Sequence, residues 1–400
     1  MNSQPIFART RMLIGMTGMI ILIHFPPVMA QILPATSVFA VDMSFHEPNG
    51  FDKRLLIVDK GGILWQTGNL EDVKKNHTAQ SASNRQDDKP DPVQAYPIRN
   101  HVKSVSALYA VFIIDDNDIL WGWGKTANGQ LLISTDSNIV IPEKDPIKIL
   151  TDVQSVLGND YTVLAIRKDN TLWAWGHSST LRGDNLPGPL NRPRKILDHV
   201  VTVVNSDNHA VALKEDGTLW TWGNNECGGL GNGHSGYENY RPTPMDMGLF
   251  RGKRILSIAA RSNENIVLTE NNTLWYWGND NGYKPYCMNE PVSLPEPLKK
   301  KIPEKLEKLV YEKTYLWGGA LYALDTGHTL YYMASVNPDP SYDIDVTKID
   351  KNVSEVISTT DWLAILKKDG TVWIKKYPHT NEPFISVHFV QPKQNDHDYK

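Results

Sequence analysis

Short apolar runs alternate with pairs of turn-forming residues along most of the chain. The clearest runs cover residues 161–169, 209–216, 265–271 and 362–369. Each ends in a pair such as Asp216-Gly217, which can place both central residues of a two-residue type I′ hairpin at positive φ. Apolar residues spaced two apart then continue beyond the turn. The pattern predicts antiparallel β-hairpins, whereas the best helical stretch, residues 304–310, is short.

The strand after each turn belongs to a phrase of eight residues that recurs seven times. The first aromatic residue of each copy marks the spacing: Trp65, Trp121, Trp173, Trp220, Trp275, Tyr331 and Trp373. The six intervals are 56, 52, 47, 55, 56 and 42 residues, longer than the roughly 33–34 residues of common helical solenoid units. Ten of the twelve tryptophans lie inside the phrase, so tryptophan serves the repeat.

Both faces of the tryptophan strands are apolar. In the fourth copy Trp220 and Trp222 share one face, and Leu219 and Thr221 share the other. Strands buried on both faces fit sheets that stack radially, because each blade of a propeller packs against two neighbours. The sequence therefore predicts an all-β fold, a seven-bladed β-propeller.

The two ends of the repeat array differ. The first copy has an abbreviated lead, whereas residues 384–390 follow the seventh copy and have the pattern of an outer strand. We predict that this C-terminal strand completes the N-terminal blade, so that N- and C-terminal strands pair and close the ring. The propeller should span residues 41–400, with a polar insertion over 69–96 whose composition predicts a mobile loop.

The fourth copy resembles the repeat of the regulator-of-chromosome-condensation family. It runs from Asn208-His209 through Asp216-Gly217 to the two tryptophans and a glycine-rich loop over 228–233, and the resemblance extends from about residue 55 to the C-terminus. It implies a seven-bladed propeller that binds another macromolecule. The sixth and seventh copies depart from the pattern, with Met333-Ala334 and Lys375-Lys376 in place of the second tryptophan and its glycine.

Residues 1–40 have the features of an export signal. Arg9 and Arg11 precede a twelve-residue apolar run over 12–23, and cleavage could follow Ala30 or, by preference, Ala40. An uncleaved anchor is the alternative, although the run is shorter than the ~20 residues that span a bilayer. We expect a secreted or envelope-associated protein without an integral membrane segment after signal removal. Secreted bacterial family members, such as β-lactamase inhibitor protein II, are then the closer comparison than nuclear exchange factors.

Charge and cysteine content narrow the function classes. The net charge of -4 is opposite in sign to a general nucleic-acid clamp, so we expect no nucleic-acid partner. Only Cys227 and Cys287 occur, which excludes a small disulfide framework and paired-cysteine metal sites. Both lie in corresponding loops of adjacent repeats, where a disulfide and two free thiols both remain open.

No catalytic motif is present in the sequence. P-loop, dinucleotide-binding, nucleophile-elbow and HExxH patterns are missing, and residues 115–118 lack the glycine and distant glutamate of a calcium loop. His209 occupies the family's turn position, where a buried side chain bonded to a neighbouring carbonyl is expected. We therefore expect no enzyme, no cofactor and no metal.

A variable set of residues falls on one predicted rim of the ring. The turn eleven or twelve residues before each marker carries Tyr109, Tyr161, Asn208, Asn263 and Trp362, with Trp317 close to the equivalent place. Tyrosine and tryptophan dominate interface hot spots, so these residues are candidates for partner binding. The alternative is that each residue caps its own hairpin.

Three hypotheses follow for the function. The first is a secreted, monomeric, non-enzymatic propeller that binds a protein through one rim, with inhibition of a partner enzyme as one form. The second is a cell-wall or glycan-acting enzyme that uses acids of the same rim, such as Asp160 and Glu264. The third is a purely structural envelope module.

Overall fold

The structure is a computed structural model. It describes residues 37–41 (backbone), 54–68, 70, 91–107, 110–125, 127–133, 139–159, 161–186, 188–245, 250, 252–278, 287–294, 299–311, 321–334, 336, 344–358, 362–376 and 383–390. Strands dominate this part of the chain, which confirms the predicted all-β class. Its helical elements are the short η1 (Ala127–Gly129), α3 (Ser179–Arg182) and η2 (Glu226–Gly228). None of the described helices is long and apolar enough to cross a bilayer, and the apolar run over 12–23 lies outside the described residues.

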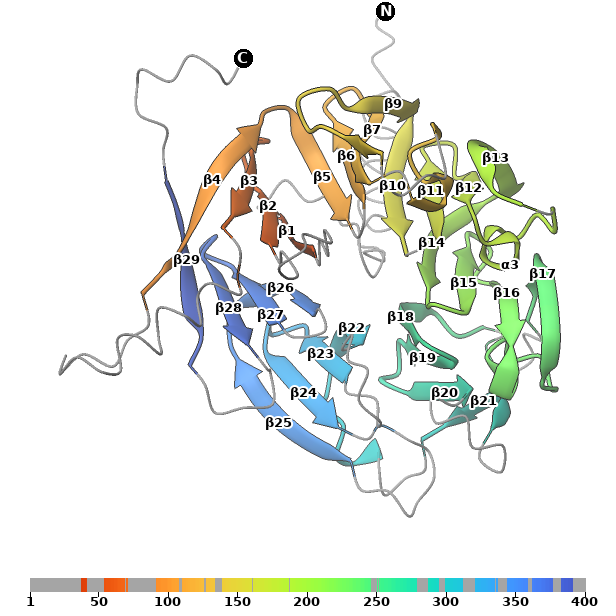
Figure 1. The fold of residues 1–400 in the computed structure, drawn as a ribbon. Coiled ribbons are helices and arrows are strands. Elements are labelled where there is room, and N and C mark those ends of the chain that lie inside the picture. Colours follow the sequence, from red (N-terminus) through yellow and green to blue (C-terminus); the bar gives the residue numbers. More distant parts are fainter. Residues whose placement is uncertain are drawn as a thin grey trace, which may run out of the picture.

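The strands form successive antiparallel units that are placed around a ring (Figure 1). The first unit contains β1 (Ser37–Val41), β2 (Arg54–Val58), β3 (Leu64–Thr67) and β4 (Val93–Arg99). The second contains β5 (Val102–Ala107), β6 (Ala110–Asp115), β7 (Leu120–Lys125), β8 (Val140–Ile141) and β9 (Ile147–Leu150). The third contains β10 (Val153–Gly158), β11 (Thr162–Arg167), β12 (Leu172–Gly176) and β13 (Leu190–Leu197). In each unit the chain runs from the inner strand outward (Figure 1).

The later units repeat this order. The fourth unit contains β14 (Val200–Asn205), β15 (His209–Lys214), β16 (Leu219–Asn225) and β17 (Gly236–Pro244), and the fifth contains β18 (Ile255–Arg261), β19 (Glu264–Thr269), β20 (Leu274–Gly278) and β21 (Met288–Ser293). The sixth contains β22 (Leu306–Tyr311), β23 (Leu321–Asp325), β24 (Leu330–Ala334) and β25 (Asp345–Asp350). The last contains β26 (Val353–Ser358), β27 (Trp362–Lys367), β28 (Val372–Lys376) and β29 (Ile385–Phe389). The helical candidate at 304–310 was wrong, because β22 covers most of it.

The turn between the second and third strands contains the predicted residue pair but is not type I′. Only the second residue of each pair has positive φ, namely Gly62, Asp118, Asn170, Gly217, Asn272, His328 and Gly370. The Gly62 N–H donates to the Asp59 carbonyl at 3.0 Å, as in a type I turn followed by a left-handed residue. The Asp59 carboxylate accepts the N–H groups of Gly61 and Ile63, which stabilises this turn and explains the difference.

The same left-handed residue links neighbouring units. Its carbonyl accepts the N–H of the first residue of the next inner strand, at 2.9 Å from Val153 to Asp118 and at 2.8 Å from Val200 to Asn170. At the fifth unit the side-chain Oδ1 of Asn272 takes this role and accepts the Leu306 N–H at 2.8 Å. The hairpin turns therefore position the adjacent sheet as well as closing their own.

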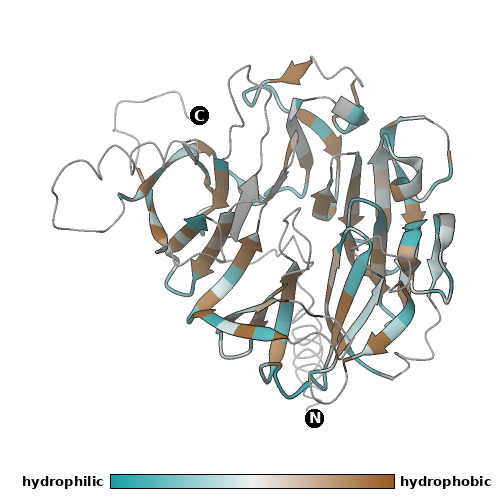
Figure 2. Ribbon diagram, turned by 60° about the horizontal axis from the view of Figure 1, so that its bottom comes forward, coloured by the Kyte–Doolittle hydropathy of each residue, from teal (hydrophilic) through white to brown (hydrophobic). Residues whose placement is uncertain are grey.

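The two tryptophans of a phrase have different environments. Trp222 is fully buried, and its indole N–H donates at 2.8 Å to the Leu181 carbonyl in the loop of the preceding unit. Trp175 and Trp277 make the equivalent bonds to the Gln130 and Gly229 carbonyls. Trp220 is half-buried at the hairpin, with the Lys214 ammonium 4.6 Å from its ring centroid. Predicted core burial is thus confirmed for the second tryptophan, and apolar residues fill the strands generally (Figure 2).

The C-terminal strand β29 joins the first and last units. It pairs antiparallel with β28 and parallel with β4, so that Val387 lies opposite both Val372 and Val93. The first unit already has four strands, and β29 is therefore the fourth strand of the last unit rather than a missing strand of the first. This differs from the prediction because four of the five residues of β1, the lead of the first unit, fall within the predicted signal over residues 1–40.

The predicted polar insertion is shorter than its assigned bounds. Residues 71–90 lie outside the described residues, whereas 93–96 belong to β4, in which Val93 and Ala95 are buried and Gln94 and Tyr96 are exposed. This alternation is that of a strand with one face on the core and the other face in water. The two exposed positions, Gln94 and Tyr96, explain why composition alone assigned residues 93–96 to the polar insertion.

Candidate functional site

One edge of the ring, which we call the loop rim, carries the turns between first and second strands and the loops after third strands. Backbone bonds hold the two kinds of segment together: the His177 N–H donates to the Tyr161 carbonyl at 2.7 Å, and the Asn224 N–H to the Asn208 carbonyl at 2.8 Å. The opposite edge, the hairpin rim, carries the turns between second and third strands. The predicted partner-binding positions thus share one edge with the glycine-rich loops.

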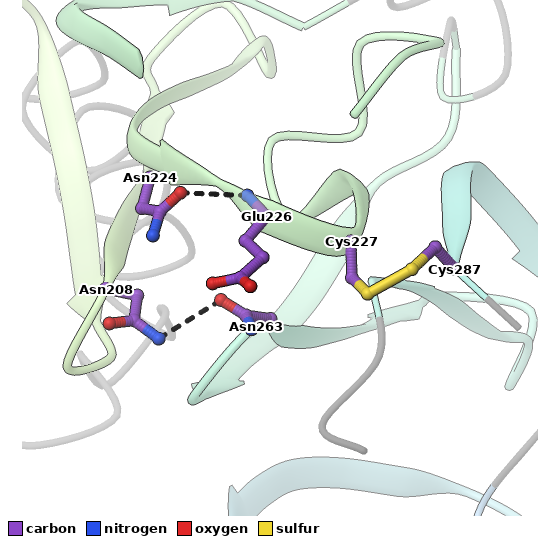
Figure 3. Close-up of a disulfide and its surroundings, with 6 residues drawn as sticks. All are labelled: Asn208, Asn224, Glu226, Cys227, Asn263 and Cys287. Carbon is purple, nitrogen blue, oxygen red and sulfur yellow. Dashed lines mark hydrogen bonds between the residues drawn. A yellow bond between two sulfur atoms is a disulfide. The ribbon is translucent and has the colours of Figure 1, made fainter. Parts of the chain in front are cut away.

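The candidate residues differ in how much surface they offer. Tyr161 is 47% exposed, and the half-buried Asn208 donates its amide to the Asn263 Oδ1 at 3.1 Å (Figure 3). Asn263 is buried, and Trp362 is only 3% exposed among apolar residues of the last and first units. Tyr109 and Trp317 lie outside the described residues. The structure therefore brings Asn208 and Asn263 together, and of the two described aromatic candidates it exposes Tyr161 and buries Trp362.

A buried polar chain that the sequence did not reveal runs beneath the loop rim. It starts in the second unit, where the Gln130 amide donates to the Asn159 carbonyl at 2.5 Å. The Asn159 amide then donates to the Ser206 carbonyl in the fourth unit at 3.0 Å. Buried polar groups must find partners, so these side chains fix the relative positions of loops from neighbouring sheets.

His209 continues the chain into the fifth unit. Its Nδ1 lies 2.9 Å from the Ser206 Oγ, and its Nε2 lies 2.7 Å from the Asn265 Oδ1. The Asn265 amide nitrogen donates to the Gly229 carbonyl, so its oxygen faces the imidazole and accepts from Nε2. The expected burial of His209 is confirmed, with a side-chain carbonyl of the next unit as its partner. The spacing of 56 residues between the two hid this pairing in the sequence.

We expect the stability to fall on acidification through His209. Burial lowers the pKa of its imidazole, so the folded protein keeps it neutral where the unfolded chain would be protonated. The contribution is fully present above the unfolded pKa of about 6.5 and is lost as the pH falls below it. Urea unfolding between pH 7.5 and 5 measures this, and His209→Gln should flatten that part of the curve. The exposed His177→Gln variant is the control and should keep the wild-type dependence of stability on pH. If His209→Gln also keeps the wild-type dependence, the assignment to His209 is wrong.

A second buried cluster surrounds the acid that the enzyme hypothesis invoked. The Tyr276 hydroxyl donates to the Glu264 Oε1 at 2.6 Å, and burial raises the pKa of the Glu264 carboxyl. Asp160 itself lies outside the described residues. Glycoside hydrolysis needs a pair of carboxyls within about 10 Å of each other. In the described residues the Glu264 carboxylate is hydrogen-bonded to the Tyr276 hydroxyl instead.

A disulfide joins loops of the fourth and fifth units at the loop rim. Cys227 in η2 and Cys287, directly before β21, have Cα atoms 4.5 Å apart and close a separation of 60 residues (Figure 3). The bridge fixes the loop whose Gly229 carbonyl accepts from Asn265 and Trp277. Among the described residues, no group of three or more His, Cys, Asp or Glu side chains is arranged to hold a metal ion.

Removing this disulfide should lower the free energy of unfolding by about 2–4 kcal/mol, because the unfolded chain regains the freedom of a long loop. Urea unfolding of Cys227→Ser/Cys287→Ser measures the loss. Wild-type protein reduced with dithiothreitol should show the same loss, and the double variant should not respond to the reductant. Equal stability of oxidised and reduced wild-type protein would show that the bridge adds nothing.

Known proteins agree with this architecture. Residues 200–228 and 216–263 match models of the Regulator of chromosome condensation (RCC1) repeat. Human WBSCR16 superposes with a TM-score of 0.57 at 16% identity, over 70% of this chain and 79% of that chain. Prp20p from Saccharomyces cerevisiae gives 0.55 at 16% identity, over 77% and 78%, and yeast RCC1 (Prp20) bound to Kap60 gives 0.52 at 17% identity, over 69% and 70%. No curated protein matches this chain in sequence. Residues 200–263 therefore carry repeats of the regulator of chromosome condensation (RCC1) family, and the chain has a propeller fold.

Proposed function

We propose that this chain is a secreted, non-enzymatic, seven-bladed propeller that binds another protein through its loop rim. The observation that carries the proposal is the contrast between a fixed backbone and changing side chains there. Tyr161, Asn208 and Asn263 stand at equivalent turns of successive units, and a buried polar chain holds those turns in place. Rigid sheets that present variable side chains are a common arrangement for recognition.

The ring and its relatives support this proposal. The order of the units and the pairing of β29 with β4 support a closed ring of seven blades. Yeast RCC1 (Prp20) was solved bound to Kap60, and Prp20p has binding properties to Gsp1p and histones. The acidic balance of this chain favours a protein partner over nucleic acid. Inhibition of a partner enzyme is one form that the binding could take, and the propeller would act as a monomer.

The disulfide supports export. Disulfides persist in oxidising compartments and are rare in the cytosol, so the bridge between Cys227 and Cys287 fits a secreted or envelope-associated protein. The signal features of residues 1–40 agree with this location.

Capture from the native extracellular fraction tests the proposal. The full secreted chain, treated with a lysine-reactive cross-linker, should retain a protein that Tyr161→Ala/Asn208→Ala/Glu226→Ala loses at least tenfold. Glu226 is the exposed first residue of η2, in the loop that follows the third strand of the fourth unit. A hairpin-rim variant, Lys168→Ala/Glu215→Ala, is the control and should retain it. Equal capture by both variants would show that the partner does not bind through these residues of the loop rim. Hydrolysis of wall polymers that Glu264→Gln abolishes would favour the enzyme hypothesis.

We also expect the signal to be cut after Ala30 rather than Ala40. Strand β1 pairs with β2 from Ser37↔Val58 to Val41↔Arg54, so a cut after Ala40 would remove nearly the whole inner strand of the first blade. A cut after Ala30 keeps it. The intact mass of the secreted protein distinguishes the two, and a mature chain that starts at Val41 would contradict this expectation.

A further inference from the structure

One position of the inner strands, which surround the centre of the ring, is polar in each unit (Figure 1). In the second to seventh units the inner strand shifts register after its first paired residue, and the next paired residue is buried and polar. Such bulges re-aim a side chain. These residues, which we call the polar belt, are Ser104, Ser155, Thr202, Ser257, Lys308 and Glu355. In the first unit Ser37 holds the equivalent register position, opposite Val58.

Belt side chains of the fifth and sixth units reach the next unit of the ring. The Ser257 Oγ accepts the N–H of Leu309, the residue that follows Lys308 in β22, at 3.1 Å. Burial lowers the pKa of the Lys308 ammonium, and the carboxylates of Glu355 in β26 and Glu307 in its own strand oppose this shift. At these two junctions the belt of one unit therefore meets the inner strand of the next.

Among the described belt residues, only those of the sixth and seventh units are basic and acidic. Lys308 is 9% exposed and Glu355 is 5% exposed. The others are serine or threonine, and the hydroxyls of Ser104 and Thr202 have no hydrogen-bond partner within the described residues. A buried hydroxyl without a partner costs much less than a buried amine or carboxylate without one. Lys308 and Glu355 therefore each require the other.

Apolar packing alone does not distinguish one junction from another. Each apolar cluster of the described residues joins two neighbouring units, and all are built largely from aliphatic side chains with one or more aromatic rings. Cores of this kind tolerate the exchange of similar apolar residues. The sixth unit could thus pack against the first and leave the seventh outside the ring. Ser37 would then hold the belt position next to Lys308 and would supply no carboxylate.

We propose that Lys308 and Glu355 fix the order of units at the closing end of the ring, so that the sixth unit accepts the seventh and rejects the first. A buried polar residue that sets register at some cost in stability is used in the same way in coiled coils. The inference takes only the closed ring from the proposed function and does not depend on partner binding.

A charge exchange tests whether the two side chains act as a pair. In the full secreted chain, Lys308→Glu and Glu355→Lys should each raise the equilibrium constant of urea unfolding about 100-fold or more, because each buries two like groups together. The combined exchange restores an opposite pair and should regain about tenfold or more over either single variant. Losses that simply add in the combined variant would overturn the pairing.

Refolding tests whether the pair selects the neighbour. Lys308→Ser/Glu355→Ser gives both units the hydroxyl of the others and should keep the unfolding constant within about tenfold of the wild type, since buried ion pairs often add little net stability. Rapid dilution from urea is followed by brief limited proteolysis and intact-mass analysis. Residues 353–390 should be cut in roughly threefold more chains than in the wild type, because wrongly assembled repeats leave the last unit exposed.

The matched control is Ser104→Ala/Thr202→Ala, which changes two belt residues elsewhere and should refold as the wild type does. Wild-type refolding of Lys308→Ser/Glu355→Ser would overturn the proposal, even where the charge exchange shows a pair. Equal misfolding of the control and of the pair variant would assign the effect to the polarity of the belt in general and would also overturn it. The proposed function fails separately, if the wild-type chain captures no extracellular partner.

Discussion

Replacing Trp222 by alanine should lower the free energy of unfolding by about 3–5 kcal/mol, as for other large aromatic side chains removed from a core. Its side chain is fully buried between the third and fourth units. The change also leaves the Leu181 carbonyl without the indole N–H that it accepts at 2.8 Å, and an unpaired buried acceptor adds to the loss. Urea unfolding followed by far-ultraviolet circular dichroism measures the effect.

Trp220→Ala is the matched control, because Trp220 lies two residues earlier on the same strand and faces the same side. It is half-buried, and it would lose the Lys214 ammonium above its ring and the bond to the Thr218 hydroxyl. Such contacts are worth roughly 1 kcal/mol at an exposed site. Equal losses for the two variants would contradict the distinct roles that we assign to the pair.

Val387→Asp should cost about 3 kcal/mol or more, because it places an unpaired carboxylate where the first and last units meet. Val387 is buried and pairs with Val372 on one side and Val93 on the other. The packing of Phe389 against Trp65, with ring centroids 5.1 Å apart, depends on the same strand. Beyond the loss in urea unfolding, limited proteolysis should cut the first and last units before the others.

The neighbouring His388→Asp substitution separates strand pairing from burial. His388 lies on the same strand, but its side chain is exposed, so the new carboxylate stays in water. We expect a change within about 0.5 kcal/mol and an unaltered proteolysis pattern. A loss as large as that of Val387→Asp would mean that β29 tolerates no negative charge on either face, and that burial at the junction is not the cause.

The sequence predicted features that lie within one repeat. A phrase that places a turn pair before two tryptophans defines a hairpin locally, and the all-β class followed from its recurrence. Turn type was not predictable from the pair alone, since the carboxylate of Asp59, two positions before the Gly61-Gly62 pair, selects a type I turn. The two tryptophans also look alike in sequence, and only the neighbouring loop that accepts the Trp222 indole distinguishes them.

Contacts between residues of different repeats could not be predicted from the sequence. His209 and Asn265 occupy different units, and neither residue type signals the other. The same is true of the candidate site. Trp362 was selected by its position within the repeat, but its side chain packs among apolar residues of the first unit. A single repeat does not reveal that contact.

The direction of the bonds between hairpin turns and inner strands has a consequence for biosynthesis. The turn carbonyls of Gly62, Asp118, Asn170 and His328 are each in place before the strand that donates to them has been made. A chain that emerges N-terminus first can therefore add units one at a time to a finished template. Strand β4 must wait for β29, its partner from the far end. Prematurely terminated chains would thus keep an open strand edge, to which other nascent chains could pair and aggregate.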